Sequence, residues 1–327
     1  MPRNIPKTRK TSLLVKEDAS LMDFLIDKMG GMTRNSVKLM LGHRQVSVNG
    51  AVETRFDTPL HEGDEVVVTT GVVARELVHP KLKIIYEDDD LIVVEKKPGL
   101  LTIATHPDSN EVTCLSILKN YVKQKNPRSN IYTVHRLDRE TSGLLVFVKS
   151  YELQQYMRDY WREIVTKRTY VAVAEGSFFQ KEGRVQSWLT EDDRTCMVYS
   201  SPVDNGGKLA VTNYKVLQEK TLKPRKPDGE AKTYSLVELN LETGRKNQIR
   251  VHLTSLGHPV IGDRKYGSSE DVPIDRLALH ARVLEFIHPV TEKVVHFETI
   301  IPREFSLIFT ANASKFVVGE HFQEEVT

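Results

Sequence analysis

A charged turn followed directly by a buried strand constrains this sequence more than any other feature. The turn, residues 135–143, places one carboxylate, Asp138, between two guanidinium side chains, Arg136 and Arg139. The apolar stretch 144–148 that follows is typical of a buried strand. A carboxylate held ionised in a basic cleft suits nucleophilic or acid–base chemistry on a nucleic acid, because such a cleft attracts phosphates. Taken alone, the run also fits an ordinary charged turn that enters a strand.

The composition indicates a soluble protein of two domains and argues against several other classes. A chain of 327 residues is longer than one typical domain. Because the net charge is only +2, any basic surface must come from local clustering of basic residues. Cys114 and Cys196 lack C-x-x-C spacing, which argues against a disulfide framework and a thiolate metal site. No stretch approaches the roughly 18 apolar residues of a membrane span, and no secretory signal is present. We therefore expect a cytoplasmic protein without a membrane partner.

The first seventy residues predict a small basic domain. Residues 1–10 are typical of a flexible basic tail, and helical spacing predicts helices at 21–29 and from Thr33 to about residue 41. Strands are expected at 46–50 and 65–70. One edge of this domain would carry four basic side chains, Arg34, Lys38, His43 and Arg44. These side chains suit RNA phosphates, although solvated charges on an amphipathic helix explain them equally well.

The rest of the chain mixes strands and helices without a regular βαβ order, which favours an α+β fold with a mixed or antiparallel sheet. Residues 153–164 predict one amphipathic helix whose aromatic side chains lie in the core. Residues 177–233 predict short strands alternating with polar loops, including a mobile charged insertion at 220–232. The sequence holds no G-x-G-x-x-G loop, no P-loop and no histidine–carboxylate cluster at metal spacing, so we expect neither a nucleotide cofactor nor a metal.

Residues 135–147, H-R-L-D-R-E-T-S-G-L-L-V-F, resemble the catalytic motif of the RluA family of pseudouridine synthases. Further segments resemble this family in the same order: 96–100, 167–172, 243–253, and 257–263 with 277–281. The succession of short pieces over 11–72 likewise resembles the S4 RNA-binding domain. The resemblance implies an S4-like domain at 11–72, a linker at 73–82, an α+β catalytic domain at 83–310 and a polar tail at 311–327.

The resemblance implies an isomerase that converts uridine in RNA into pseudouridine without a cofactor. Asp138 is the expected catalytic carboxylate, either as a nucleophile on the ribose or as a base that gives a glycal, and the sequence does not choose between these routes. The resemblance also implies that Arg250 pairs with Asp138, that Tyr170 lies against the uracil ring and could help remove its C5 proton, and that Ile249 contacts the base.

Three residues beside Asp138 are also expected at the substrate. Arg136 would fill the space that an extruded nucleotide leaves, because its planar guanidinium can stack on neighbouring bases. His135 and Leu137 flank Arg136 in the same run and are predicted to bind substrate. One departure from the family is Asn247, which stands where a histidine is common.

The S4-like domain favours large-subunit ribosomal RNA as the substrate, with transfer RNA as the second choice. A non-catalytic RNA-binding or ribosome-assembly factor is the alternative from another class. An RNA methyltransferase would need a cofactor loop that the sequence lacks. A monomer is the expected state.

Overall fold

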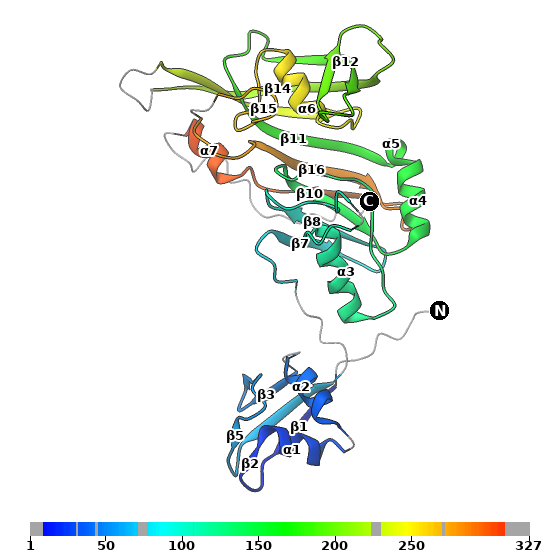
Figure 1. Cartoon of the computed structure of the whole chain (residues 1–327), viewed down its shortest axis with the longest axis vertical. Coiled ribbons are helices and arrows are strands. Elements are labelled where there is room, and N and C mark those ends of the chain that lie inside the picture. Colours follow the sequence, from blue (N-terminus) through cyan, green and yellow to red (C-terminus); the bar gives the residue numbers. More distant parts are fainter. Residues whose placement is uncertain are drawn as a thin grey trace. The chain divides into compact units, whose positions relative to one another are not determined.

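The computed structural model describes residues 9–30, 32–42, 45–70, 77–106, 108–223, 230–269 and 272–310. It divides into two units (Figure 1): the first comprises residues 1–76 with 124–127, and the larger one comprises residues 77–123 with 128–327. The predicted tails, most of 1–10 and all of 311–327, lie outside the described residues, as do His43 and Arg44. Within the described ranges, no helix is long and apolar enough to cross a membrane.

The first unit packs two helices on a four-stranded antiparallel sheet of order β1-β6-β3-β4. Helix α1 begins after Ser20, whose hydroxyl accepts the N–H of Asp23 and so caps the helix. Asn49 and Gly50 both have positive φ, as a two-residue hairpin turn requires. The elements are β1 Arg9–Leu14, β2 Ala19–Ser20, α1 Leu21–Lys28, α2 Arg34–Gly42, β3 Val46–Val48, β4 Ala51–Val52, β5 Pro59–Leu60 and β6 Glu65–Thr70. Strand β1 thus starts two residues inside the stretch predicted to be a tail.

The larger unit is built on one sheet of eleven strands among the described residues from 77 to 310. Its main path runs β13-β12-β14-β15-β11-β16-β10-β8-β7, with β17 paired to β16 and β9 paired to β10. Every pairing is antiparallel except that of β10 with β16. The strands are β7 Leu82–Glu87, β8 Leu91–Lys96, β9 Tyr132–Thr133, β10 Ser142–Val148, β11 Val165–Glu175, β12 Glu182–Glu191, β13 Val198–Ser201, β14 Lys208–Leu222, β15 Lys232–Leu241, β16 Leu279–Ile287 and β17 Val294–Glu298.

Five helices flank this sheet in the described part of the larger unit (Figure 1). They are α3 Cys114–Lys125, α4 Tyr151–Asp159, α5 Trp161–Ile164, α6 Gln248–Ser255 and α7 Arg303–Phe309. Helix α6 contacts β13 and β14, and α7 contacts β14. The predicted helix at 153–164 is therefore two helices, which meet at Tyr160.

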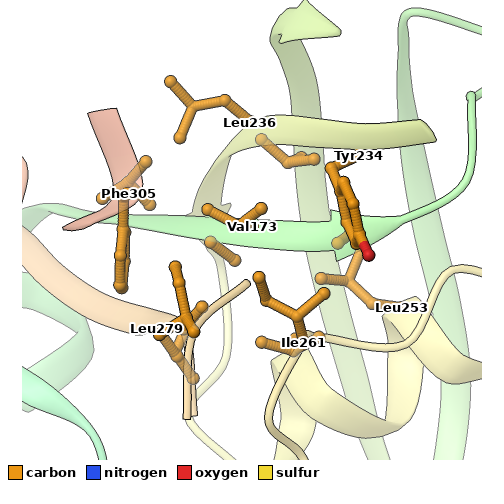
Figure 2. Close-up of a cluster of buried hydrophobic side chains, with 14 of the residues drawn as sticks. Val173, Tyr234, Leu236, Leu253, Ile261, Leu279 and Phe305 are labelled. Atoms are coloured by element: carbon orange, nitrogen blue, oxygen red, sulfur yellow. The ribbon is translucent and has the colours of Figure 1, made fainter. Parts of the chain in front are cut away.

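The largest apolar cluster joins the middle of the sheet to the segments that cover it (Figure 2). Val173 of β11, Leu236 of β15 and Leu279 of β16 are each under 5% exposed, as are Leu253 of α6 and Phe305 of α7. Burial of one such side chain stabilises the fold by about 1.5–3 kcal/mol. This cluster fixes α6 against the sheet, which matters because α6 carries Arg250.

The prediction for residues 177–233 is wrong in its main feature. Strand β14 has 15 residues, and it pairs with β15 from Thr212 opposite Leu241 to Leu222 opposite Lys232. Residues 220–222 and Lys232 therefore belong to a hairpin and not to a separate insertion, while residues 224–229 lie outside the described part. A register shift between Val216 and Gln218 interrupts the alternation of side chains, which hid the length of this strand.

Candidate active site

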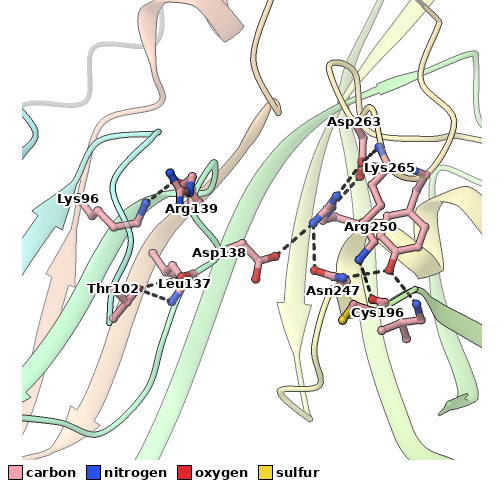
Figure 3. A network of polar contacts seen from close by, with 12 residues as sticks. Lys96, Thr102, Leu137, Asp138, Arg139, Cys196, Asn247, Arg250, Asp263 and Lys265 are labelled. Carbon is pink, nitrogen blue, oxygen red and sulfur yellow. Dashed lines mark hydrogen bonds and ion pairs between the residues drawn. The ribbon is translucent and has the colours of Figure 1, made fainter. Parts of the chain in front are cut away.

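The loop that carries Asp138 is fixed by hydrogen bonds on both sides of that residue (Figure 3). The Thr102 hydroxyl donates to the Leu137 carbonyl at 2.8 Å and accepts the Leu137 N–H at 3.1 Å. The fully buried Nζ of Lys96 donates to the Arg139 carbonyl at 2.9 Å. Burial lowers the pKa of Lys96 to about 8, which leaves it mostly charged at neutral pH. The main chain around Asp138 is thus held in place before any substrate arrives.

Gly143 determines where this loop enters strand β10. Its φ is +119°, and a Cβ added there would lie 2.2 Å from the carbonyl oxygen of Ala281 on β16. Only glycine combines that backbone conformation with so close an approach. The last residue of the run 135–143 is therefore required by the parallel pairing of β10 with β16.

Arg250 reaches the loop from α6, whose start is fixed by the side chain of Gln248. The amide oxygen of Gln248 accepts the Thr243 hydroxyl at 2.8 Å and the Arg245 N–H at 3.0 Å. The preceding residue, Asn247, has φ 55° and ψ 17°, a left-handed conformation that asparagine tolerates better than most residues. This turn aims the third residue of the helix, Arg250, at Asp138.

The guanidinium of Arg250 lies between two carboxylates (Figure 3). Its Nη1 donates to Asp138 at 3.4 Å, and its Nε and Nη2 donate to Asp263 at 2.7 and 2.8 Å. Burial alone would lower the pKa of Arg250, but the hydrogen bonds and charge of Asp263, with the charge of Asp138, raise it. Asp138 is the accessible acid, since its side chain is 32% exposed and that of Asp263 is 0% exposed.

Asp138 and Arg250 open onto a cavity of about 430 Å³, within the usual range for a small-molecule site. Six of the residues predicted at the catalytic centre or the substrate line this cavity: Arg136, Leu137, Asp138, Tyr170, Ile249 and Arg250. The other lining residues are Thr141, Glu191, Leu241, Gly244, Arg245, Lys246, Asn247, Gln248 and Leu279. The structure therefore brings together residues from five separate segments of the sequence.

The cavity combines an apolar side with a phenol. Ile249 is 4% exposed and Leu279 is 4% exposed, so both present buried apolar surface beside the polar groups. Burial raises the pKa of Tyr170, and the negative charge of Asp138 adds to the rise. The phenol of Tyr170 is therefore protonated at neutral pH, and its ring offers a flat surface to a planar ligand.

His135 is not among the residues that line the cavity. Its ring packs against Trp161 with 4.8 Å between centroids, and its Nε2 accepts the N–H of Val146 at 3.1 Å. Burial lowers the pKa of His135 to about 3, with a further contribution from the charge of Arg168, so the ring is neutral. His135 therefore contacts Trp161 and strand β10, and its substrate contact stays a prediction.

The residues predicted to bind RNA in the first unit are only partly described. Arg34 is exposed, with its Nη2 3.9 Å from a carboxylate oxygen of Asp23. The Nζ of Lys38 lies 4.9 Å from the centroid of the Phe56 ring. Both side chains belong to α2, four residues apart, and an exposed pair such as Arg34 with Asp23 contributes little stability.

One group of side chains in the described residues has metal-like spacing. Candidate ligand atoms of Asp88, Asp90 and His288 lie within 4.8 Å of one another. Asp88, however, already accepts the backbone N–H of Asp90 and of Leu91 and the hydroxyl of Tyr86, and its carboxylate lies 3.0 Å from the His288 ring. Through these contacts the three side chains connect the turn after β7 to the turn after β16.

The two residues that hold Arg250 in place were given no role from the sequence. Asp263 pairs with Arg250, and Asn247 accepts a hydrogen bond from Arg250 Nη1 at 2.9 Å while donating to the Tyr266 hydroxyl. The segment 257–263 was noted for its family resemblance, but nothing in the sequence shows that Asp263 meets Arg250. That contact depends on the packing of the segment after α6 against the helix.

The family model described as RNA pseudouridylate synthase matches residues 90–255, which hold Asp138, Tyr170 and Arg250. This match covers about half of the chain. The chain belongs to the RNA pseudouridylate synthase family. The protein is accordingly an RNA pseudouridine synthase, and the α+β fold predicted from the sequence is confirmed.

This synthase is similar to curated bacterial proteins over most of its length. It is 33% identical to the uncharacterized RNA pseudouridine synthase YhcT of Bacillus subtilis, over 81% of this chain and 84% of the relative. It is also 33% identical to ribosomal large subunit pseudouridine synthase D of Nitrosomonas europaea, over 85% of this chain and 80% of the relative. Among solved structures, the human RNA pseudouridylate synthase domain containing 1 matches with 26% identity and a TM-score of 0.53, covering 69% of this chain and 87% of that one.

Proposed function

We propose that this pseudouridine synthase modifies large-subunit ribosomal RNA and that Asp138 is its catalytic carboxylate. The observation that carries this proposal is the position of Asp138. It lies in the wall of a nucleoside-sized cavity, on a fixed loop and within hydrogen-bond distance of Arg250. A nearby guanidinium favours the charged form of a carboxylate, and the charged form is the one that can act as nucleophile or base.

The reaction needs only what this cavity offers. The bond from uracil N1 to ribose C1′ breaks, a bond from C5 to the same C1′ forms, the C5 proton leaves and N1 gains a proton. Nothing is oxidised and no group arrives from outside, so we propose that no cofactor takes part. Asp138 would either attack C1′ or remove a ribose proton to give a glycal. Tyr170 and Ile249 would hold the uracil ring between them while it turns, and the Tyr170 hydroxyl would assist loss of the C5 proton.

The target uridine has to leave its stack before it can enter the cavity, at a cost of a few kcal/mol. Arg136 is exposed at the cavity, and it forms no hydrogen bond or ion pair with any residue in the described ranges. Its guanidinium is therefore free to occupy the vacated position and to stack on the neighbouring bases. Leu137 lies beside it, 6% exposed, and would contact the nucleotide through its apolar side chain.

Large-subunit ribosomal RNA is favoured because the similarity to the Nitrosomonas enzyme reaches beyond the catalytic unit. Residues 77–327 make up about three quarters of the chain, so a match over 85% must include part of the first unit. We propose that the first unit is an S4-like RNA-binding domain, with Arg34, Lys38, His43 and Arg44 as its phosphate contacts. We further propose that the enzyme acts as a monomer in the cytoplasm.

The test maps pseudouridines in ribosomal and transfer RNA from cells that lack the gene or carry it as wild type, Asp138→Asn or Glu140→Gln. Glu140 is an exposed acid in the same run and is the matched control. We expect a large-subunit site to disappear on deletion and to return with the wild type and Glu140→Gln but not with Asp138→Asn. Loss of a site in transfer RNA instead would overturn the ribosomal assignment, and a fully active Asp138→Asn would reject Asp138 as the catalyst.

A further inference from the structure

Arg168 on strand β11 is a half-buried guanidinium without a partner. Among the residues that the structure describes, it forms no hydrogen bond and no ion pair. Burial, together with the like charge of Arg162, lowers the pKa of Arg168, while guanidinium groups remain charged in proteins. A partly desolvated cation without an acceptor is unfavourable, so its position needs an explanation other than stability.

Arg168 is not itself a lining residue of the cavity that holds Asp138, but its guanidinium lies against one lining residue, Gly244. Arg168 and Tyr170 are two residues apart on β11, so their side chains lie on the same face of the sheet. On the opposite side, a Cβ added to Gly244 would lie 2.7 Å from Nη1 of Arg168. Since both Tyr170 and Gly244 line the cavity, Arg168 lies next to its lining, near the position proposed for the uracil ring.

Gly244 leaves room for this arrangement. Its φ lies outside the left-handed region, so the backbone conformation alone does not require glycine there. The space that a Cβ would occupy is taken by Nη1 of Arg168. The glycine at position 244 is therefore explained by the guanidinium that packs against it.

Of the four cations that line the cavity, all except Arg136 are already neutralised or bound. Arg250 pairs with Asp263, Lys246 pairs with Glu191, and the Nε of Arg245 donates to the Leu209 carbonyl. In the described part of the chain, Arg168 therefore differs from them in having all its donors available. An anion with several acceptor oxygens would satisfy such a fork of donors best.

We propose that Arg168 binds a backbone phosphate of the RNA next to the target uridine and so positions the flipped nucleotide over Asp138. This inference rests on the proposed function, because the phosphate belongs to the nucleotide that enters the cavity. Arg136 and Arg168 then have separate tasks. Arg136 fills the stack that the uridine leaves, and Arg168 holds the backbone of the uridine that has left it.

The test uses the full chain and large-subunit ribosomal RNA that is transcribed in vitro with tritium at C5 of uridine, because isomerisation releases that hydrogen. For Arg168→Ala we expect kcat/KM to fall about tenfold or more, mainly through KM, as for the loss of one charge-assisted hydrogen bond. The slope of log kcat/KM against log salt concentration should become shallower by about 0.7–0.9, the value for one phosphate contact. Arg168→Lys should restore part of the lost kcat/KM, since lysine keeps the positive charge but lacks the planar set of N–H donors of a guanidinium.

Two further variants separate phosphate binding from general effects. Gly244→Ala displaces the guanidinium, so it should reduce kcat/KM in the wild type but have little additional effect in Arg168→Ala. Arg303→Ala removes an exposed arginine of α7 that forms no side-chain hydrogen bond or ion pair in the described residues, and it should leave kcat/KM and the salt slope unchanged. Circular dichroism melting of each variant confirms that it is folded.

An unchanged kcat/KM and salt slope in Arg168→Ala would overturn the phosphate assignment while leaving the proposed function intact. A loss that is equal at every salt concentration would also reject it, because the side chain would then act through structure and not through charge. If the wild type releases no tritium from this RNA, the ribosomal substrate is wrong. Filter binding of the same RNA by wild type and Arg168→Ala then decides the role of Arg168, through the same difference in salt slope.

Discussion

Arg250 and Asp263 form a two-point ion pair inside the larger unit, with Nε–Oδ2 and Nη2–Oδ1 distances of 2.7 and 2.8 Å. Two of the three nitrogens of the guanidinium are thereby committed to a carboxylate that is fully buried. Only Nη1 faces the cavity, where it meets Asp138 at 3.4 Å. The pair with Asp263 therefore fixes the direction of Arg250 and balances its charge, so that Asp138 is oriented without being fully neutralised.

Asp263→Asn should reduce both stability and activity. Removal of one charge from a buried pair leaves the other uncompensated, which costs about 3–5 kcal/mol. Arg250 would then be free to turn toward Asp138, and the tighter pair would make that carboxylate less reactive. Urea unfolding and tritium release from C5-labelled RNA measure the two effects. Asp138→Asn provides the comparison, because its exposed, longer contact predicts a stability loss below 1 kcal/mol. Equal stability of the two variants would contradict this view of the pair.

Asn247→Ala should lower kcat about tenfold with little change in KM. The Asn247 amide accepts from Arg250 Nη1 and donates to the Tyr266 hydroxyl, each at 2.9 Å, so it holds Arg250 at the angle that reaches Asp138. Alanine removes both contacts and is disfavoured in the left-handed conformation of residue 247 by about 1–2 kcal/mol.

Asn247→His is the matched variant, because histidine tolerates that backbone conformation and its ring can accept from Arg250. Single-turnover rates should rank wild type and Asn247→His above Asn247→Ala. A histidine variant as slow as the alanine variant would show that the amide acts in some other way.

The elements that could be predicted from the sequence are those with side chains buried on both faces. The elements that were missed are those whose side-chain pattern reflects pairing with a neighbouring strand or helix. Every residue of β10 is buried, and the apolar run alone located that strand. The length of strand β14 was missed because its outer half carries polar side chains, which form a strand through their pairing with β15. The predicted helix at 153–164 breaks at Tyr160, and Tyr156 and Tyr160 are 42% and 52% exposed, so these rings do not lie in the core as expected.

The candidate site likewise combines residues that the sequence identified with contacts that only the fold reveals. The run 135–143 identified Asp138 because a carboxylate among guanidinium groups is visible along the chain. The contact of Arg250 with Asp138, 112 residues away, came only from family resemblance, and the partner of Arg250, Asp263, was not found at all. Arg168 was recognised as part of a segment, but the absence of an acceptor around it is a property of the folded chain. A single sequence does not show which residues far apart along the chain become hydrogen-bond partners.

Lys96→Met should destabilise the larger unit by about 3 kcal/mol. The buried ammonium donates to the carbonyls of Lys97, Leu100 and Arg139, and methionine would leave these acceptors without their donor. Because Arg139 follows Asp138, activity should fall with stability. Lys97→Met is the control, since Lys97 is half exposed and its side chain pairs with Glu95 alone among the described residues. Thermal melting of both variants checks the prediction, which is wrong if their melting temperatures fall by the same amount.

Stability should fall as the pH drops from 7.5 to 5, because three buried histidines are neutral in the folded protein. Burial lowers the pKa of His135 and His280 to about 3 and that of His252 to about 4. The unfolded chain takes up protons at these positions below about pH 6.5, whereas the folded chain does not. The unfolded state therefore binds more protons in this window, and the free energy of unfolding falls by about 1.4 kcal/mol per pH unit for each histidine.

His252→Gln isolates one of these contributions. The ring of His252 lies between the hydroxyls of Ser187 and Thr212, at 3.0 and 2.8 Å, and glutamine can bond to hydroxyl groups without titrating. Between pH 7.5 and 5 the wild type should lose about 2 kcal/mol more than the variant. Both tryptophans, Trp161 and Trp188, lie in the larger unit, so urea unfolding followed by tryptophan fluorescence reports on that unit alone. If the two proteins lose the same free energy over this range, the pKa of His252 is the same in the folded and the unfolded chain, and burial does not lower it.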